Sequence, residues 1–187
     1  MNKDIKVSLY LQKMQSEDLL NKKGNALDLG CGAGADSLAL AQMGYEVDSV
    51  DSHNERIQAL KEKIGELNIR AVQVDIRDFN IDREKYSVII CSNVLSFLKN
   101  KEEIFTTIRK MSDGLVPQGV MYFTVFGPHD EWADNKEMMF IEYEDVLKFL
   151  NDLPLKIYHR STEEGYGKKM DGTIKYWHIH RFFCVKK

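Results

Sequence analysis

A glycine-rich segment carries the strongest chemical signal in this sequence. The segment NALDLGCGAG, residues 25–34, is a short apolar run that carries Asp28 and leads into three alternating glycines: Gly30, Gly32 and Gly34. Glycines that alternate after an apolar run are typical of a strand that turns tightly into a helix around a ligand. The pattern therefore predicts a ligand site at this turn, with a carboxylate close to it.

Two further aspartates follow the next two apolar runs of the chain. Asp51 ends the run YEVDSVD, and Asp75, followed by Ile76, ends the run IRAVQVD. In an open α/β sheet, ligands bind at the carboxyl ends of the strands, so these acids are expected beside the glycine turn. Asp51 is placed to accept hydrogen bonds from a ribose diol. Asp75 is placed to accept from the exocyclic amine of adenine, with Ile76 packed on the base.

The glycine spacing alone leaves the ligand open. Gly30, Gly32 and Ala35 also satisfy G-x-G-x-x-A, a form of the dinucleotide fingerprint. Asp28 decides between the two ligands, because its carboxylate would repel a pyrophosphate at the helix N-terminus. S-adenosylmethionine instead carries a sulfonium and an ammonium, both cationic. We expect Asp28 to orient the amides of the glycine loop and to help bind that ammonium.

Apolar runs and helical stretches alternate along most of the chain, which favours a mostly parallel sheet with helices on both faces. Strands are expected at residues 25–30, 45–51, 69–75, 86–92, 119–126, 155–161 and 176–185. The last two are joined by residues 163–173, a connection that suits an antiparallel pair. Helices are expected at residues 7–20, 36–43, 54–64, 101–114 and 143–150, with Asp36 and Asn100 as N-caps.

Bulk composition favours one ordinary globular domain over residues 1–187. The chain is 43% hydrophobic and 29% charged, with a net charge of −3 and no basic stripe of the kind that binds nucleic acid. Three widely spaced cysteines indicate neither a disulfide framework nor a zinc site. No signal peptide or long apolar run is recognisable, so a cytoplasmic location without a membrane partner is expected. Within the domain, a helical segment at about 1–22 and a substrate-covering loop at about 127–142 are predicted.

These motifs resemble those of the class I S-adenosylmethionine-dependent methyltransferases, and most closely the tellurite-resistance type. The segments LDLGCGAG, VDSVD, VQVDIRD, YSVIICSNVLSFL and GVMYFTVF carry the likeness. The resemblance implies a Rossmann-like, doubly wound, seven-stranded sheet whose last strand is antiparallel. It also implies S-adenosyl-L-methionine as methyl donor, with S-adenosyl-L-homocysteine as product. The implied donor contacts are Asp28, Gly30, Cys31, Gly32, Gly34, Asp51, Ser52, Asp75, Ile76, Cys91 and Ser92.

Methyl transfer is an in-line displacement that needs alignment and a water-poor pocket, and a base only when the acceptor arrives protonated. The candidates for catalysis are His129 in the covering loop, Arg160 on the sixth strand and His178 on the seventh. An anionic acceptor would use Arg160 and the histidines, whereas a cationic one would use Asp130 and Glu131. No third ligand is spaced to complete a metal site with His178 and His180.

The acceptor is expected to be a small molecule, and an oxyanion such as tellurite or selenite fits the resemblance. The acidic balance and the residues Cys91-Ser92-Asn93-Val94, where base-methylating relatives carry Asn- or Asp-Pro-Pro-aromatic, argue against nucleic acid. Two alternatives remain: a non-catalytic protein that binds the donor, and a nicotinamide-dependent oxidoreductase, which Asp28 disfavours. The oligomeric state is expected to be a monomer or a homodimer.

Overall fold

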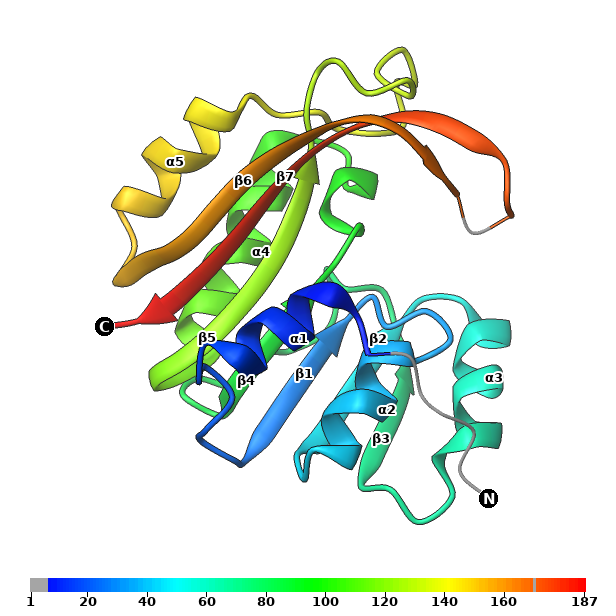
Figure 1. Cartoon of the computed structure of the whole chain (residues 1–187), viewed down its shortest axis with the longest axis vertical. Helices are drawn as coiled ribbons and strands as arrows, with labels where there is room; N and C mark the ends of the chain where they lie inside the picture. Colours follow the sequence, from blue (N-terminus) through cyan, green and yellow to red (C-terminus); the bar gives the residue numbers. More distant parts are fainter. Residues whose placement is uncertain (1–6, 170) are drawn as a thin grey trace.

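The computed structural model describes residues 7–169 and 171–187. Its centre is a seven-stranded sheet of order β3-β2-β1-β4-β5-β7-β6, in which β7 is antiparallel to both of its neighbours and the other strands run parallel. This order and this single reversed strand confirm the fold class predicted from the sequence (Figure 1). No helix in these residues combines the length and apolar character needed to cross a bilayer.

Strands and helices alternate through the first two thirds of the chain, and a long hairpin closes it. The strands are β1 (Asn25–Leu29), β2 (Glu46–Asp51), β3 (Ile69–Gln73), β4 (Tyr86–Cys91), β5 (Leu115–Phe126), β6 (Leu155–Lys168) and β7 (Ile174–Lys186). The helices are α1 (Leu9–Ser16), α2 (Ala35–Gln42), α3 (Asn54–Ile64), the 3-10 turn η1 (Leu95–Phe97), α4 (Lys101–Gly114) and α5 (Tyr143–Asn151).

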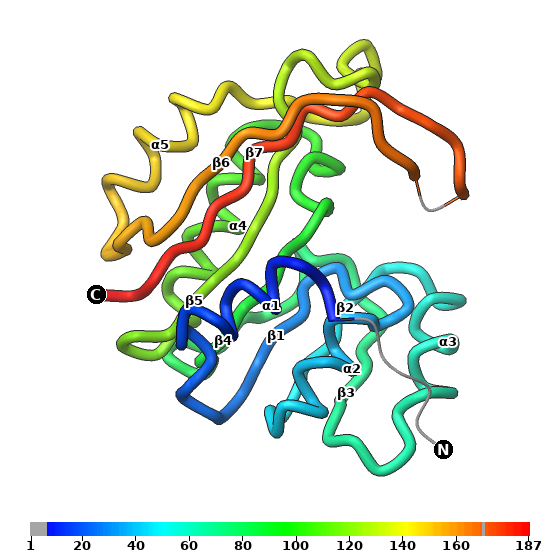
Figure 2. The backbone as a smooth tube through the Cα atoms, in the orientation of Figure 1, coloured from blue at the N-terminus to red at the C-terminus, as the bar shows by residue number. Residues whose placement is uncertain are grey.

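Two apolar layers sandwich the sheet. On one face α1 and α2 bury Leu11, Met14 and Leu40 against the sheet, and α3 packs beside α2. On the other face α4 and α5 bury Ile104, Ile108 and other apolar side chains against the sheet. Every residue of β4 is buried, as expected for a central strand covered on both faces. The sheet therefore holds the carboxyl ends of β1, β2 and β4 in fixed positions (Figures 1 and 2).

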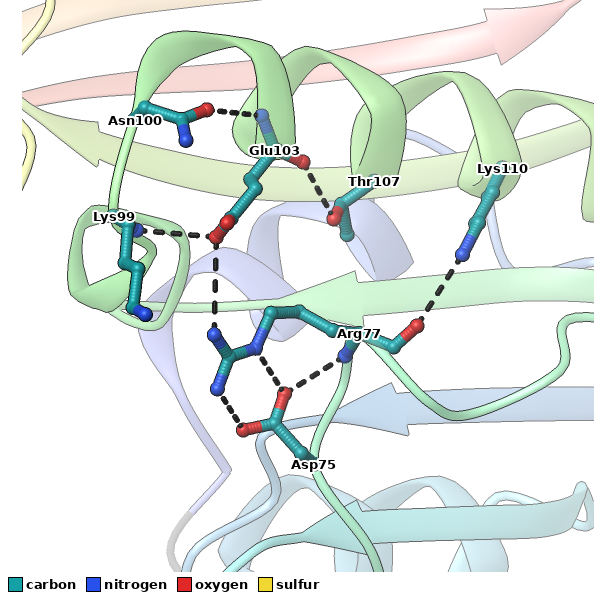
Figure 3. A network of polar contacts seen from close by, with 7 residues as sticks. All are labelled: Asp75, Arg77, Lys99, Asn100, Glu103, Thr107 and Lys110. Carbon is teal, nitrogen blue, oxygen red and sulfur yellow. Dashed lines mark hydrogen bonds and ion pairs between the residues drawn. The ribbon is translucent and has the colours of Figure 1, made fainter.

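The start of α4 follows the sequence prediction and the start of α2 does not. The Asn100 side chain accepts a hydrogen bond from Glu103 N at 2.9 Å, which is the expected cap (Figure 3). Gly34, in a left-handed conformation, precedes α2, and Asp36 lies inside its first turn. The prediction that Asp36 caps this helix is therefore wrong, because the helix begins one residue earlier and the Asp36 carboxylate accepts from Tyr10 instead.

The terminal hairpin is longer than the sequence indicates. Residues 163–168, expected in the connecting loop, continue β6 as far as Lys168, which pairs with Ile174. The two glycines in this stretch, Gly165 and Gly167, have low strand propensity, but pairing with β7 overrides it. The expected third strand also ends earlier, at Gln73, so Asp75 lies in the turn that follows it. The predicted helix over residues 7–20 shortens to Leu9–Ser16, and residues 1–6 of the N-terminal segment lie outside the described residues.

Candidate functional site

The glycine loop between β1 and α2 is built so that only one of its glycines faces open space. Gly30, Gly32 and Gly34 all have positive φ angles, of 84°, 54° and 81°. A Cβ on Gly30 would lie 2.2 Å from Val94, and one on Gly34 would lie 2.3 Å from Leu60, so both are packed tightly. A Cβ on Gly32 would meet nothing within 4 Å. The open side of Gly32 is therefore where a ligand can approach the loop.

Asp51 holds this loop in place from the end of β2. Its Oδ2 accepts a hydrogen bond from Gly32 N at 2.9 Å, and its Oδ1 accepts from His53 N at 2.9 Å. Arg56 approaches the same carboxylate at 3.7 Å. Asp51 is buried, yet it lines a cavity of about 140 Å³ at this edge of the sheet. The carboxylate thus joins the loop to the cavity, with acceptor sites left for a diol.

Asp28 makes different contacts from those expected. Its Oδ2 accepts a hydrogen bond from Ser37 Oγ at 2.6 Å, and Ser37 in turn accepts from Ser49. Burial, and then the charge of nearby Asp36, raise the pKa of Asp28 well above its ordinary value. Asp28 thus binds the first turn of α2, and the carboxylate that holds a glycine-loop amide is Asp51. The prediction that Asp28 orients those amides is wrong for this reason.

Five of the expected donor contacts line the cavity of about 140 Å³ together: Gly30, Asp51, Ser52, Asp75 and Ile76. The remaining wall includes residues that the sequence analysis missed: His53, Arg56, Arg77, Asn93, Val94, Phe97 and Leu98. One of these carries a recognisable signal, since Asn93 follows β4 and adopts a positive φ of 57°, which asparagine tolerates well. The structure therefore gathers the acids of β2 and β3 in one cavity.

Arg77 occupies the carboxylate expected to hold adenine. Its Nε and Nη2 donate to Asp75 Oδ1 and Oδ2 at 2.9 and 2.8 Å, as Figure 3 shows, and Glu103 lies 4.0 Å from Nη1. Hydrogen bonds from Arg77 lower the pKa of Asp75 below its ordinary value. Asp75 is therefore charged and already paired, with Ile76 buried beside it.

The other expected donor contacts do not line this cavity. Cys91 is fully buried in the core, and burial raises the pKa of its thiol, which keeps the group protonated. Cys31 is buried, and its thiol pKa is raised for the same reason. Ser92 is half-buried after β4, where its neighbour Asn93 donates its N–H to Thr124 Oγ1 at 2.7 Å. Asn93 and Val94 line the cavity at the end of β4, where Cys91 and Ser92 were expected.

Two of the three catalytic candidates lie together. The rings of His129 and His178 stack with centroids 4.8 Å apart. His129 Nδ1 and His178 Nε2 lie 3.3 and 3.2 Å from the same oxygen of Glu164. Arg160 is on β6 opposite Phe182, four residue pairs along the hairpin from Glu164, which lies opposite His178. The structure thus joins the histidines through Glu164, whereas the side chain of Arg160 makes no hydrogen bond or ion pair with the described residues.

The position of the proton on the His178 ring favours hydrogen bonding over metal binding in this cluster. Ligand atoms of His129, Glu164 and His178 lie within 4.8 Å of one another. His178 Nδ1 accepts a hydrogen bond from His129 N at 3.0 Å, so the proton of the neutral ring is on Nε2. A metal-bound histidine instead donates its second ring nitrogen to an acceptor. Burial lowers the pKa of His178, and the neutral ring donates to Glu164.

Asp130, the candidate for a cationic acceptor, is engaged inside the protein. It pairs with the fully buried ammonium of Lys175 and accepts from His178 N at 3.1 Å. The Lys175 ammonium lies 3.9 Å from the centroid of Trp177 and 4.2 Å from that of Trp132. This cage satisfies the charge of Asp130, which therefore stabilises the loop after β5 and is not available to a substrate.

The strand order, the glycine loop and the acids after β2 and β3 define the class I methyltransferase fold. TehB of Haemophilus influenzae has the same fold: its crystal structure matches with a TM-score of 0.75 at 20% identity, over 94% of this chain and 62% of that one. A methyltransferase structure from Methanosarcina mazei matches with a TM-score of 0.72 at 17% identity, over 92% and 96%. The chain belongs to the family described as tellurite resistance protein TehB, whose model matches residues 11–132.

Curated relatives carry related names. YqeM of Bacillus subtilis strain 168, whose name describes a methyltransferase, is 33% identical over 131 residues, covering 65% of this chain and 53% of the relative. TehB of Haemophilus influenzae, whose name describes an S-adenosyl-L-methionine-dependent methyltransferase, is 42% identical over 91 residues, 46% of this chain and 30% of the relative. The chain thus spans about half or less of the length of these relatives.

Proposed function

We propose that this protein transfers the methyl group of S-adenosylmethionine to a small-molecule acceptor. The observation that carries the proposal is the pairing of Asp51 with Gly32, the one loop glycine with open space beside it. This arrangement fits a donor with a ribose diol and a methionine tail but no phosphate. The names of the relatives support the same donor.

Different residues of the cavity would contact different parts of the donor. Asp51 would accept from the ribose hydroxyls, Ile76 would pack on the adenine, and Asp75 would accept from its amine while sharing Arg77. The open side of Gly32 would admit the methionine part, and Asp28 would support the first turn of α2 behind the loop through Ser37. S-adenosylmethionine, when bound, supplies an electrophilic methyl group on a sulfonium. The chain then has to align the acceptor and exclude water.

His129, in the loop after β5, is a candidate proton acceptor. With Nδ1 of His129 directed at Glu164, its Nε2 is left to accept a proton from an alcohol or thiol acceptor. An oxyanion needs no such base. The family description names tellurite, so oxyanions such as tellurite and selenite are one class of acceptor to be tested.

Donor binding and turnover are tested separately. Calorimetry with S-adenosylhomocysteine, NAD and NADP is expected to give binding for the first compound alone; tight binding of a nicotinamide coenzyme would reject the proposal. Turnover of methyl-labelled donor is then followed with tellurite, selenite, thiols, amines and carboxylates. Binding of the donor without turnover of any acceptor would identify a non-catalytic donor-binding protein.

A further inference from the structure

One row of side chains crosses the sheet from the donor side to the last strand. The pairings place Asp28 opposite Ile90, Ile90 opposite Tyr122, and Tyr122 opposite Phe183, which pairs with His159. Residues opposite one another in neighbouring strands point to the same face, so the whole row lies on the face covered by α1 and α2. The side chain of Tyr122 is therefore level with Asp28 on the same face, two strands away from it.

A second cavity, of about 390 Å³, lies over the far half of this row. It opens between α1 and strands β5, β6 and β7, and α1 crosses this face of the sheet in Figure 1. Tyr10, Tyr122 and Phe183 line it, together with the polar side chains of Lys13, Glu163 and Arg181. The volume is in the range of sites for organic molecules, and the walls are mostly aromatic and apolar.

Tyr10 ties this cavity to the donor loop. Its ring stacks on Tyr122 with centroids 4.0 Å apart, and its hydroxyl donates to Asp36 in the first turn of α2. That turn follows Gly34 directly, so a wall of the cavity is bonded to the segment that would carry the methionine part of the donor. The wall of the cavity is therefore connected to the helix that follows the glycine loop.

The polar groups of the cavity favour an anion. Arg181 Nη1 donates to Tyr122 Oη at 3.2 Å, which holds the guanidinium against the cavity wall. The other edge of Arg181 pairs with Glu163, whose side chain is 63% exposed and is free to swing into solvent. Lys13 and His159 line the same space. An incoming carboxylate could replace Glu163 and form the bidentate pair that arginine favours.

We propose, on the basis of the proposed methyl transfer, that this cavity is the acceptor site and that Arg181 binds the acceptor's anionic group. The acceptor class is a small organic anion with a flat apolar body, held between the aromatic walls with its carboxylate on Arg181. A body of this kind uses the aromatic lining, which an inorganic oxyanion would leave unfilled. Arg160, on the opposite face of β6, has no part in this site.

The test measures binding and turnover with 4-hydroxybenzoate, 4-aminobenzoate and 4-mercaptobenzoate as probes, and with tellurite and selenite in parallel arms. Binding is followed by ligand-observed NMR on the complex with S-adenosylhomocysteine, and turnover with methyl-labelled donor. Arg181→Gln is expected to weaken binding of the aromatic carboxylates about tenfold or more, because a hydrogen bond to a charged group is lost. The matched control Arg83→Gln, at an exposed arginine between β3 and β4, is expected to have no effect.

A second variant covers the case in which Arg181→Gln does not fold. Ser161→Phe fills the cavity from β6, directly opposite Arg181, and keeps the arginine itself. It is expected to abolish probe binding while the affinity for S-adenosylhomocysteine stays unchanged. The proposal is overturned if none of the aromatic carboxylates binds the wild type, if Ser161→Phe binds them normally, or if Arg160→Gln weakens them and Arg181→Gln does not. If the wild type does not bind S-adenosylhomocysteine, the proposed function is rejected instead.

Discussion

The Asp51 carboxylate and the Gly32 amide join the end of β2 to the glycine loop through a hydrogen bond of 2.9 Å. The bond fixes the loop and leaves the carboxylate on the wall of the cavity. Asp51 also accepts from His53 N at 2.9 Å, and His53 Nδ1 lies 3.0 Å from the same oxygen. In the proposed donor complex, the ribose hydroxyls would donate to this same carboxylate.

Asp51→Ala is therefore expected to weaken binding of S-adenosylhomocysteine by about 1.5–3 kcal/mol, the value of hydrogen bonds to a charged group. Calorimetry measures the change. Glu46→Gln, at the exposed start of the same strand, is the matched control and is expected to bind normally. An unchanged dissociation constant for Asp51→Ala would remove this residue from the donor site.

The glycine loop gives a second prediction, because Gly32 and Gly34 differ in their surroundings. In Gly32→Ala, the new methyl group meets no protein atom, so the loss of stability is the backbone cost alone, about 1–2 kcal/mol. In Gly34→Ala, the collision with Leu60 adds to that cost. Urea unfolding is expected to rank Gly34→Ala as the less stable variant.

Donor binding is expected to separate the same two positions. The added methyl group of Gly32→Ala occupies the open side of the loop, so affinity for S-adenosylhomocysteine is expected to fall by about 1.4 kcal/mol or more, a factor of ten. If Gly32→Ala is less stable than the wild type but binds S-adenosylhomocysteine with unchanged affinity, the donor approaches the loop elsewhere.

Sequence reasoning could predict that Gly30, Asp51 and Asp75 lie together, because these residues are set by local order. A strand, a glycine turn and a helix place Asp51 near Gly32 wherever the sheet is parallel, and the alternation of strands and helices indicates a parallel sheet. The pairing of Arg77 with Asp75 is equally local, two residues apart, but it depends on how one turn folds and on no periodic pattern.

The face of β6 on which Arg160 lies could not be predicted in this way, because it depends on a single bulge. The register of β6 against β7 shifts between Ile157 and His159, and this places Arg160 opposite Phe182 on the α5 face. Without the shift, Arg160 would lie opposite Arg181 and face α1. An extra residue in one strand moves every later side chain to the other face, and alternation in the sequence does not reveal it.

The adenine side gives a third prediction, since Asp75 and Arg77 form a pair of which one member is proposed to contact the donor. Asp75→Asn is expected to weaken binding of S-adenosylhomocysteine by about 1.5 kcal/mol, because a charged acceptor for the adenine amine is lost. Arg77→Gln leaves the Asp75 carboxylate in place and is expected to change the affinity by less than about threefold, or 0.6 kcal/mol. Equal losses in the two variants, measured by calorimetry, would mean that the ion pair as a whole supports the site.

His180 gives a prediction for the pH dependence of stability. The side chain is 2% exposed, and burial, followed by the neighbouring charge of His178, lowers the pKa of His180 to about 4. In the unfolded chain, a histidine has a pKa of about 6.5, so between these values the unfolded state binds the proton more strongly. The contribution of His180 to the free energy of unfolding is therefore fully present above about pH 6.5, and it decreases as the pH falls towards 4.

The variant His180→Asn removes this proton and keeps a polar side chain for Thr162, which lies 2.8 Å from His180 Nδ1. Urea unfolding at pH 7.5 and pH 5.0 is expected to show that the wild type loses about 2 kcal/mol more than the variant over this interval, from 1.4 kcal/mol for each pKa unit. Carboxylates titrate in both proteins, so their contribution cancels in the comparison. Equal losses would show that His180 takes up its proton in the folded protein at the ordinary pH, and that the strand face beneath α5 is open to water.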